Sequence, residues 1–470
     1  MKSRTLFTSM ILALTFTIVL GPGMATQSIQ AASLLPASLP NLPVGDRVWN
    51  LLYIDGLNNA LNKGTEPSLA FDKVTNLPYI SYYNNTTQEL VLGRWVGTGG
   101  NCAFGAWWCP VVDTVGDVGL GSSLAIHDQV STVGGKLGIS YYDLTNKRLK
   151  FTQWACNPGC SWTTYNFPSG TPTFDSGRHS SLKYNSLGEP QIAYTYNSDE
   201  PGNPWSAMKF CTWVGSGGDT GDGAFNCEYV EQLPVLNCCS NPSLALDPTT
   251  DIPRIAYYDS QFGNLRFVQG GANGGGDCSD KDWFCYWIDY TGDVGKYPSL
   301  DVIQKKDGSV RMGIAYYDAT NGNLKYAHPV AGTGNCGSNY WQCDAVDTMG
   351  VGIPATPLSL ILDINANPTI AYQDFGATYK ALKIARIPGT VGLIDGNCGP
   401  VVGVLHTFQC DVLDPGGHGG TGNSDDGFFP SIARSSSGLI YIAYKEYLNT
   451  SGSLKLAYQA IGTYLPITRK

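Results

Sequence analysis

Acidic and tyrosine side chains recur together at several places along this 470-residue chain. Five stretches end in a Tyr-Tyr-Asp triplet or a near variant of it. The candidate ligand-binding residues come from these stretches: Tyr83, Tyr142, Asp143, Tyr258, Asp259, Tyr317, Asp318 and Asp374. Carboxylates and phenols hydrogen-bond to sugar hydroxyls, so one hypothesis is a ring of sugar-binding groups. The alternative is that each Asp bonds the backbone of its own turn, as Asp commonly does.

A second set of acids follows an aromatic residue by six positions, as Asp113 follows Trp107. In two copies of this pattern another acid comes four residues later. Ca²⁺ takes about six to eight oxygen ligands, which suits carboxylates combined with loop carbonyls. The candidate metal ligands are Asp113, Asp117, Asp289 and Asp293. Their spacing matches no EF-hand loop, and Ca²⁺ is the one cofactor that the sequence suggests.

These residues belong to a repeat that is marked by Ser-Leu or Ser-Ile. Its first copy contains Pro67-Ser68-Leu69-Ala70, and six further copies follow. The marker serines are Ser68, Ser123, Ser181, Ser243, Ser299, Ser359 and Ser431. Successive markers are 55 to 72 residues apart, which is longer than a WD40 repeat and near or above the kelch period.

Each copy has the composition of four β-strands. The marker lies in the first strand, and the Tyr-Tyr-Asp stretch, rich in β-branched and aromatic residues, ends the second. An alternation such as Leu149-Lys150-Phe151 predicts a half-exposed third strand. The aromatic and acidic residues of the fourth strand share one face, because their spacing is even. In the second copy Trp162 is present, but Pro168 replaces the acid.

The seventh copy has no fourth strand after it, but Trp49 and Asp55 show the same spacing ahead of the first copy. We therefore expect the N-terminal strand to complete the last blade. Seven four-stranded repeats closed in this way predict an all-β, seven-bladed propeller of antiparallel strands. Both sets of acids should gather on one rim, because the turn after the second strand and the link after the fourth strand lie at the same end.

Catalysis would need residues that break the symmetry near the propeller axis. Glu66, Arg178 and His179 do so just before the first strands of their copies, and they are the catalytic candidates. Lys296 and Tyr297 hold the same place in the fifth copy. An acid, a base and cations around one pore could act in glycoside chemistry. The alternative is that these are single solvated side chains at loop ends.

The 14 cysteines follow the repeats. Six pairs fall between the third and fourth strands: Cys102 with Cys109, Cys156 with Cys160, Cys211 with Cys227, Cys278 with Cys285, Cys336 with Cys343, and Cys398 with Cys410. Each pair lacks a neighbouring Cys pair or His, so disulfides are favoured over metal sites. Cys238 and Cys239 remain, and we expect a strained vicinal disulfide between them.

The N-terminus has the pattern of a signal peptide over residues 1–25, with Lys2 and Arg4 ahead of an apolar stretch. Its alternative is an uncleaved membrane anchor. We expect a linker over 26–47, the propeller over 48–460, a tail over 461–470 and no transmembrane segment in the mature chain. Paired cysteines fit secretion or a cell-surface location. The net charge of −9 argues against a nucleic-acid partner, because an acidic surface repels phosphate.

The recurring Ser-Leu-Ala, Ile-Ala-Tyr-Tyr-Asp and Leu-Lys-Tyr-Ala stretches resemble the repeat of secreted bacterial seven-bladed propellers, some of which are lectins. The resemblance extends to the architecture of sialidase-like propellers, but their Ser-x-Asp-x-Gly-x-x-Trp box is absent. It implies an extracellular binding protein for glycans or for a cell-surface protein. The alternatives are a glycan-cleaving hydrolase or lyase with an axial active site, and a structural envelope component.

Overall fold

The computed structural model divides the chain into two units, Met1–Asn41 and Leu42–Lys470. The residues described are 47–56, 61–128, 130, 135–156, 159–168, 174–198, 202–235, 238–350, 357–376, 380–387, 397–398, 408–416, 424–448 and 451–461. The predicted signal peptide lies outside these residues, as do the predicted linker and tail apart from one residue each. No helix in the described part of the chain is long and apolar enough to cross a membrane.

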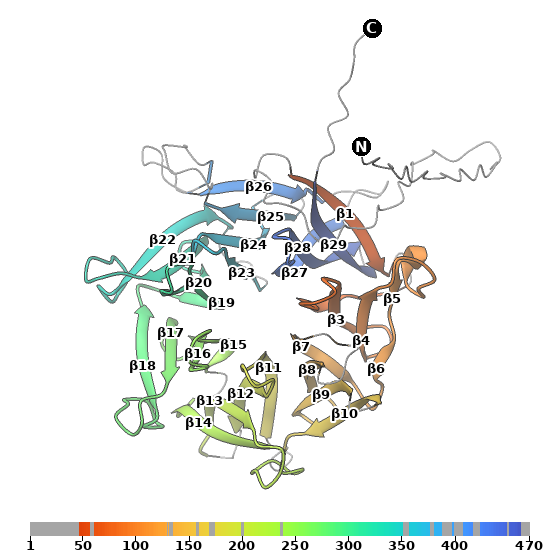
Figure 1. The fold of residues 1–470 in the computed structure, drawn as a ribbon. Coiled ribbons are helices and arrows are strands. Elements are labelled where there is room, and N and C mark those ends of the chain that lie inside the picture. Colours follow the sequence, from red (N-terminus) through yellow and green to blue (C-terminus); the bar gives the residue numbers. More distant parts are fainter. Residues whose placement is uncertain are drawn as a thin grey trace, which may run out of the picture. The chain divides into compact units, whose positions relative to one another are not determined.

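The described part of the second unit is a propeller of seven antiparallel sheets, one for each repeat (Figure 1). Blades are numbered by repeat, and their strands are given from the axis outward. Blade 1 holds β2 (Thr65–Phe71), β3 (Pro78–Asn84), β4 (Glu89–Trp95) and the short β5 (Trp107–Trp108) and β6 (Val111–Asp113), with a 3₁₀ turn η2 (Ala103–Gly105). Blade 2 holds β7 (Val118–His127), β8 (Lys136–Asp143), β9 (Arg148–Cys156) and β10 (Cys160–Asn166).

The next three blades follow the same order. Blade 3 holds β11 (Phe174–Tyr184), β12 (Pro190–Ser198), β13 (Trp205–Trp213) and β14 (Phe225–Leu233). Blade 4 holds β15 (Ser240–Leu246), β16 (Pro253–Asp259), β17 (Asn264–Gly270) and β18 (Trp283–Asp289). Blade 5 holds β19 (Val294–Gln304), β20 (Val310–Asp318), β21 (Asn323–Pro329) and β22 (Trp341–Thr348).

The last two blades complete the ring. Blade 6 holds β23 (Ser359–Leu362), β24 (Pro368–Asp374), β25 (Ala381–Arg386) and β26 (Gln409–Asp414). Blade 7 holds β27 (Ser424–Arg434), β28 (Ile440–Leu448), β29 (Ser451–Ile461) and, on the outside, β1 (Arg47–Asp55). β1 pairs with β29 from Arg47↔Ile461 to Asp55↔Leu454, which confirms that the N-terminal strand completes the last blade.

The marker serines join the blades around the axis. Ser68 Oγ of blade 1 accepts a hydrogen bond from the backbone N–H of Leu124 in blade 2 at 2.9 Å. The other six serines make the same bond to the following blade at 2.9 to 3.2 Å, and Ser431 closes the ring by accepting from Leu69 N–H. The repeat marker is therefore the contact that ties each inner strand to the next.

The hydrophobic core is divided among the interfaces between blades. One cluster combines Ile80 and Trp107 of blade 1 with Leu454 and Leu456 of blade 7. Every residue of β3 is buried, because neighbouring blades cover both faces of the sheet. Full burial of each large apolar side chain contributes roughly 1.5–3 kcal/mol.

Six disulfides form in the described residues, and all six are those expected from the sequence. They join Cys102 to Cys109, Cys156 to Cys160, Cys211 to Cys227, Cys278 to Cys285, Cys336 to Cys343, and Cys398 to Cys410. Each bond connects the third and fourth strands of its blade, or the loop between them. The disulfides therefore fasten the outer part of blades 1 to 6.

The expected vicinal disulfide does not form. Cys238 and Cys239 are free, fully buried thiols whose Sγ atoms lie 2.8 Å apart. Neighbouring cysteines bridge only in strained geometry, and here both side chains already pack in an apolar cluster with Phe210 and Leu244.

Candidate functional site

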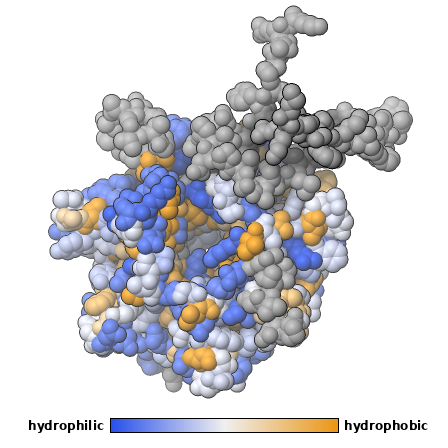
Figure 2. Space-filling view, viewed as in Figure 1, coloured by the Kyte–Doolittle hydropathy of each residue, from blue (hydrophilic) through white to orange (hydrophobic). Residues whose placement is uncertain are grey.

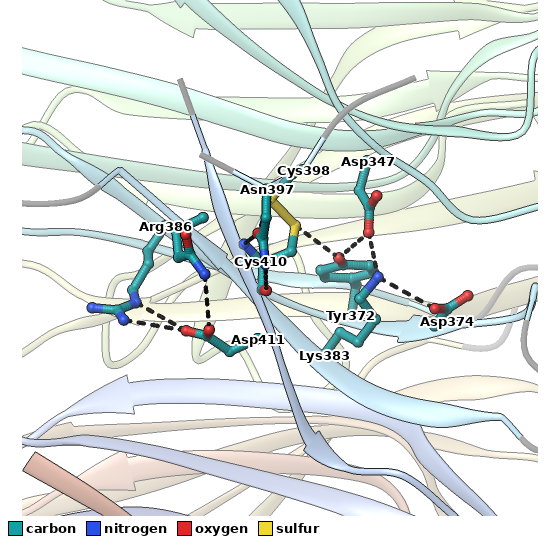
Figure 3. The surroundings of a disulfide bond; sticks show 10 residues. Asp347, Tyr372, Asp374, Lys383, Arg386, Asn397, Cys398, Cys410 and Asp411 are labelled. Atoms are coloured by element: carbon teal, nitrogen blue, oxygen red, sulfur yellow. Dashed lines mark hydrogen bonds and ion pairs between the residues drawn. A yellow bond between two sulfur atoms is a disulfide. The ribbon is translucent and has the colours of Figure 1, made fainter. Parts of the chain in front are cut away.

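In six of the seven blades, the acid near the end of the fourth strand lies in the interface with the next blade, where it meets a tyrosine and a basic residue. Figure 3 shows one case, in which Asp347 of β22 accepts a hydrogen bond from the Tyr372 hydroxyl of β24. Lys383 Nζ of β25 lies 2.6 Å from Asp347 Oδ2 and 3.3 Å from Asp374 Oδ2. Burial alone would lower the pKa of Lys383, but its hydrogen bond to Asp347 and that carboxylate's charge outweigh burial and raise it. We call this arrangement an interblade triad.

Interblade triads occupy six of the seven interfaces. They are Asp55–Tyr82–Lys63, Asp113–Tyr141–Lys150, Glu231–Tyr257–Arg266, Asp289–Tyr316–Lys325, Asp347–Tyr372–Lys383 and Asp414–Tyr444–Lys455. The prediction of a half-exposed third strand is therefore wrong for Lys150, which is 5% exposed. Its ammonium group can be buried because the neighbouring blade supplies the carboxylate.

The acids of the Tyr-Tyr-Asp stretches stabilise their own turns. Asp143 Oδ1 accepts a hydrogen bond from the backbone N–H of Asn146 at 2.9 Å, and Asp318 Oδ1 accepts one from Asn321 N–H at 3.0 Å. Asp259 and Asp374 make the equivalent bonds two residues ahead, at 3.0 and 2.8 Å. This geometry favours the turn-forming alternative, because these oxygens are already used within the fold.

The candidate metal ligands are likewise engaged with other side chains. Asp113 and Asp289 belong to interblade triads. Asp117 Oδ1 accepts from the Tyr83 hydroxyl at 2.9 Å, and Asp293 Oδ1 accepts from the Tyr258 hydroxyl at 2.7 Å. In the residues that the structure describes, no group of three or more His, Cys, Asp or Glu side chains is placed to hold a metal ion.

The remaining tyrosine candidates are also built into the fold. Tyr142 is 2% exposed, and so is Tyr317. The hydroxyl of Tyr317 donates to the backbone oxygen of Gly350 at 2.7 Å. The Tyr317 ring packs in a cluster that joins blades 5 and 6.

Blade 7 carries additional buried acids around its triad. Lys455 Nζ lies 2.9 Å from Asp426 Oδ1 and 3.5 Å from Glu446 Oε1, besides its contact with Asp414. Burial raises the pKa of Asp426 to about 8; the Lys455 charge opposes this and the Asp414 charge adds to it. One lysine thus balances three carboxyl groups, and the cluster holds a proton near neutral pH.

The side chains that break the repeat include one position that every blade shares, just ahead of its marker serine. We call the positions two residues before each marker serine the axial mouth: Glu66, Gly121, His179, Asn241, Tyr297, Pro357 and Phe429. Glu66, Asn241, Tyr297 and Phe429 all have left-handed φ angles of 50–54°. Because several blades share this bend, it belongs to the repeat, while the chemistry of the side chain differs in every blade.

Glu66 is the carboxylate of the axial mouth. It accepts a hydrogen bond from the backbone N–H of Gly121 in blade 2 at 2.5 Å. Burial raises the pKa of Glu66, while that hydrogen bond and the charges of Lys445 and Arg178 oppose the rise. Burial also raises the pKa of Tyr297, and the Glu66 carboxylate adds to it. Groups from blades 2, 3, 5 and 7 therefore lie within electrostatic reach of Glu66 in blade 1.

The pKa values of two basic side chains in this region, those of His179 and Lys445, are lowered. Burial lowers the pKa of His179 to about 4, and the neighbouring Arg178 charge adds to the effect. Burial lowers the pKa of Lys445 to about 7, against the charge of Glu66. Lys445 Nζ donates to Asn62 Oδ1 at 2.6 Å and to Asn85 Oδ1 at 3.2 Å.

Sequence reasoning identified Glu66, Arg178 and His179 but missed other axial groups. Lys445 replaces the second tyrosine of the Tyr-Tyr-Asp stretch, and Asp301 follows the marker Ser-Leu where most copies have Ala. Burial raises the pKa of Asp301, against two hydrogen bonds from backbone N–H groups and the charges of Lys183 and Arg434. The sequence signal that could have found them is their departure from the repeat, Asp301 in the first strand of its blade and Lys445 in the second strand of its blade.

Figure 2 shows one face of the molecule, on which small hydrophobic groups are scattered among hydrophilic residues. On this face, a binding site therefore has to be identified from individual side chains and not from one large apolar patch.

The chain matches no protein-family model, and no curated protein matches it. Solved structures resemble it in fold. A fucose-specific lectin from Aleuria aurantia has 12% identity and a TM-score of 0.41, covering 77% of this chain and 97% of its own. An oligogalacturonate lyase in complex with manganese has 9% identity and a TM-score of 0.46, covering 88% and 97%. The polysaccharide lyase Uly1 has 10% identity and a TM-score of 0.42, covering 87% and 92%. Identity this low describes a likeness of fold and identifies no ligand.

Proposed function

We propose that this protein is a secreted or cell-surface saccharide-binding protein whose ligand enters the axial mouth. One observation carries the proposal: the axial mouth gathers unlike polar and aromatic side chains from several blades, whereas the repeated acids are used in triads and turns. Binding sites for small molecules combine apolar and aromatic walls with a few placed polar groups. Six disulfides are typical of proteins from an oxidising environment, which supports the extracellular setting.

The groups of the axial mouth suit sugar hydroxyls. The Glu66 carboxylate and the neutral His179 ring accept hydrogen bonds, and the Asn241 amide both donates and accepts. Tyr297 and Phe429 offer aromatic faces to the C–H groups of a sugar ring. All five side chains are half-buried, so a ligand that reaches them loses contact with water and each hydrogen bond gains in strength.

A glycan-array screen of residues 26–470 tests this function, with calcium and with a chelator. We expect binding that persists in chelator and that Glu66→Gln weakens by about ten-fold, corresponding to about 1.4 kcal/mol. Glu89→Gln is the matched control, because Glu89 lies in β4, away from the axial mouth, and its side chain accepts a hydrogen bond from Thr87. Binding lost on chelation would move the site to the candidate metal ligands Asp113, Asp117, Asp289 and Asp293. No binding to any glycan would overturn the proposal.

Glycan cleavage is the second candidate function, and the perturbed pKa values of the axial region favour it. A carboxyl group with a raised pKa can donate a proton, and a lysine with a pKa of about 7 can accept one. The test is incubation of the array ligands with the protein, followed by measurement of new reducing ends. Turnover that Glu66→Gln abolishes would establish an enzyme, and unchanged ligands would leave binding as the function.

A further inference from the structure

We propose that the interface between blades 2 and 3 binds the carboxylate of an acidic saccharide, at the place where an interblade triad lacks its acid. In the other six interfaces the fourth strand of the preceding blade supplies Asp or Glu. Here Pro168 occupies that position, six residues after Trp162. The Pro side chain carries no oxygen and no charge, so it cannot replace the missing carboxylate.

The two donors of the triad remain in place. Tyr194 pairs with Lys209 across β12 and β13, as Tyr316 pairs with Lys325 across β20 and β21. Lys209 Nζ lies 6.0 Å from the centre of the Tyr194 ring, against 5.6 Å for Lys325 and Tyr316. We call Tyr194 and Lys209 the open triad, because they keep the geometry of a pair that elsewhere surrounds a carboxylate.

The residue before Pro168 confirms that the two interfaces correspond. Phe167 is 1% exposed and packs against the Tyr194 ring at 6.0 Å, edge to face. Ile288, which precedes the triad acid Asp289, is equally buried. The fourth strand of blade 2 therefore reaches the interface in the usual way and ends there without an acid.

Lys209 has no carboxylate within ion-pair distance among the described residues. Its Nζ lies instead over the rings of Tyr229 and Tyr196, at 4.2 and 5.3 Å from their centres. Burial lowers the pKa of Lys209, and the more distant charge of Asp219 offsets only part of this. A half-buried ammonium group without a counter-charge is unfavourable, and a carboxylate from outside the chain would relieve it.

Aromatic rings beside Lys209 indicate what kind of carboxylate fits. Tyr196, Trp205 and Tyr229 pack together with ring centres 5.2 to 5.8 Å apart. Tyr229 is 40% exposed and Trp205 is half-buried, so a ligand held by Lys209 meets aromatic faces. The C–H faces of a pyranose stack on such rings, which favours a uronic-acid sugar over a simple anion. Its residues, Tyr194 of β12 and Lys209 of β13, are not among those of the axial mouth, so this proposal does not depend on the function proposed above.

The test is calorimetric titration of the disulfide-bonded mature chain with methyl glucuronide, with methyl glucoside as the probe lacking the carboxylate. We expect glucuronide to bind and glucoside to bind at least about ten-fold more weakly. Lys209→Gln should weaken glucuronide binding by about ten-fold or more. Lys73→Gln, at an exposed lysine, is the matched control and should leave it unchanged.

Pro168→Asp gives an independent test, because it would supply the missing carboxylate within the chain. We expect it to raise the melting temperature and to abolish glucuronide binding together. Glu66→Gln should bind glucuronide as the unaltered chain does at this site, which separates failure here from failure at the axial mouth. Equal binding of glucoside, or unchanged glucuronide binding in both Lys209→Gln and Pro168→Asp, would overturn the proposal. Binding of acetyl-aspartyl-amide without binding of glucuronide would overturn the saccharide assignment.

Discussion

Replacement of Asp289 by Ala tests whether the interblade triads hold the propeller together. Asp289 is 2% exposed and accepts a hydrogen bond from the Tyr316 hydroxyl at 2.7 Å. It also faces the ammonium group of Lys325 and accepts a longer bond from the backbone N–H of Thr291 at 3.4 Å. The variant leaves that hydroxyl without an acceptor. It leaves Lys325, whose side chain is 16% exposed, with only Asp318 at 4.0 Å.

The expected loss of stability follows from the burial of these groups. Removing one partner of a buried ion pair costs about 3–5 kcal/mol, because the other charge is left uncompensated. The entropy of unfolding is about 2.1 cal/mol/K per residue. For the residues from Arg47 to Ile461, the entropy of unfolding is therefore about 0.9 kcal/mol/K. The melting temperature should therefore fall by about 3–6 °C in Asp289→Ala.

Differential scanning calorimetry at a fixed scan rate measures this change. The melting temperature of Asp289→Asn should lie between those of Asp289→Ala and the unaltered chain. This variant retains an acceptor for the Tyr316 hydroxyl but loses the charge that faces Lys325. The matched control is Asp293→Ala, because Asp293 also accepts a tyrosine hydroxyl, that of Tyr258, and pairs with a lysine, but is 42% exposed and faces the half-exposed Lys296. Surface pairs are worth about 0–1 kcal/mol. A fall in Asp289→Ala no larger than in the control would refute the structural role of the triads.

Three further predictions concern ring closure, buried charge and the free thiols. Ser431→Ala removes the acceptor of Leu69 N–H and should cost about 1 kcal/mol in denaturant unfolding; an unchanged midpoint would contradict the closing role of this bond. The raised pKa of Asp426, about 8, means that the folded chain holds a proton that the unfolded chain releases near pH 4, so this group makes stability fall from about pH 4 to about pH 8. Asp426→Asn should therefore gain stability relative to the unaltered chain as pH rises from 5 to 9. The same difference in stability between the two proteins at both pH values would refute the raised pKa of Asp426. Cys238 and Cys239 should react with a thiol reagent only after unfolding, giving two thiols per chain; no thiols after unfolding would restore the vicinal disulfide.

The fold could be predicted from the sequence because the repeat is marked by short-range patterns. Ser68 and its counterparts, the Tyr-Tyr-Asp stretches and the donated strand with Trp49 and Asp55 were sufficient for the number of blades and the closure. What the marker serine does was not predictable, because its bond to the next blade depends on how two inner strands pack. The same reason explains Lys150: sequence alternation cannot reveal a counter-ion that arrives from a neighbouring blade.

The candidate site was predictable only where a residue departs visibly from the repeat. Glu66 and His179 do so just ahead of the marker serine and were identified, whereas Lys445 and Asp301 depart after it and were missed. Pro168 was visible as a missing acid, but its consequence for Lys209 required knowing that this acid normally meets a tyrosine and a lysine. Repeats therefore identify positions well, and contacts between blades assign their chemistry.

A crystal structure of the protein with its strongest glycan-array ligand tests the central claim most directly, namely that binding takes place at the axial mouth. We predict the sugar in contact with Glu66 and Tyr297, with the interblade triads unchanged around it. A ligand bound elsewhere while the axial mouth holds only water would contradict the account.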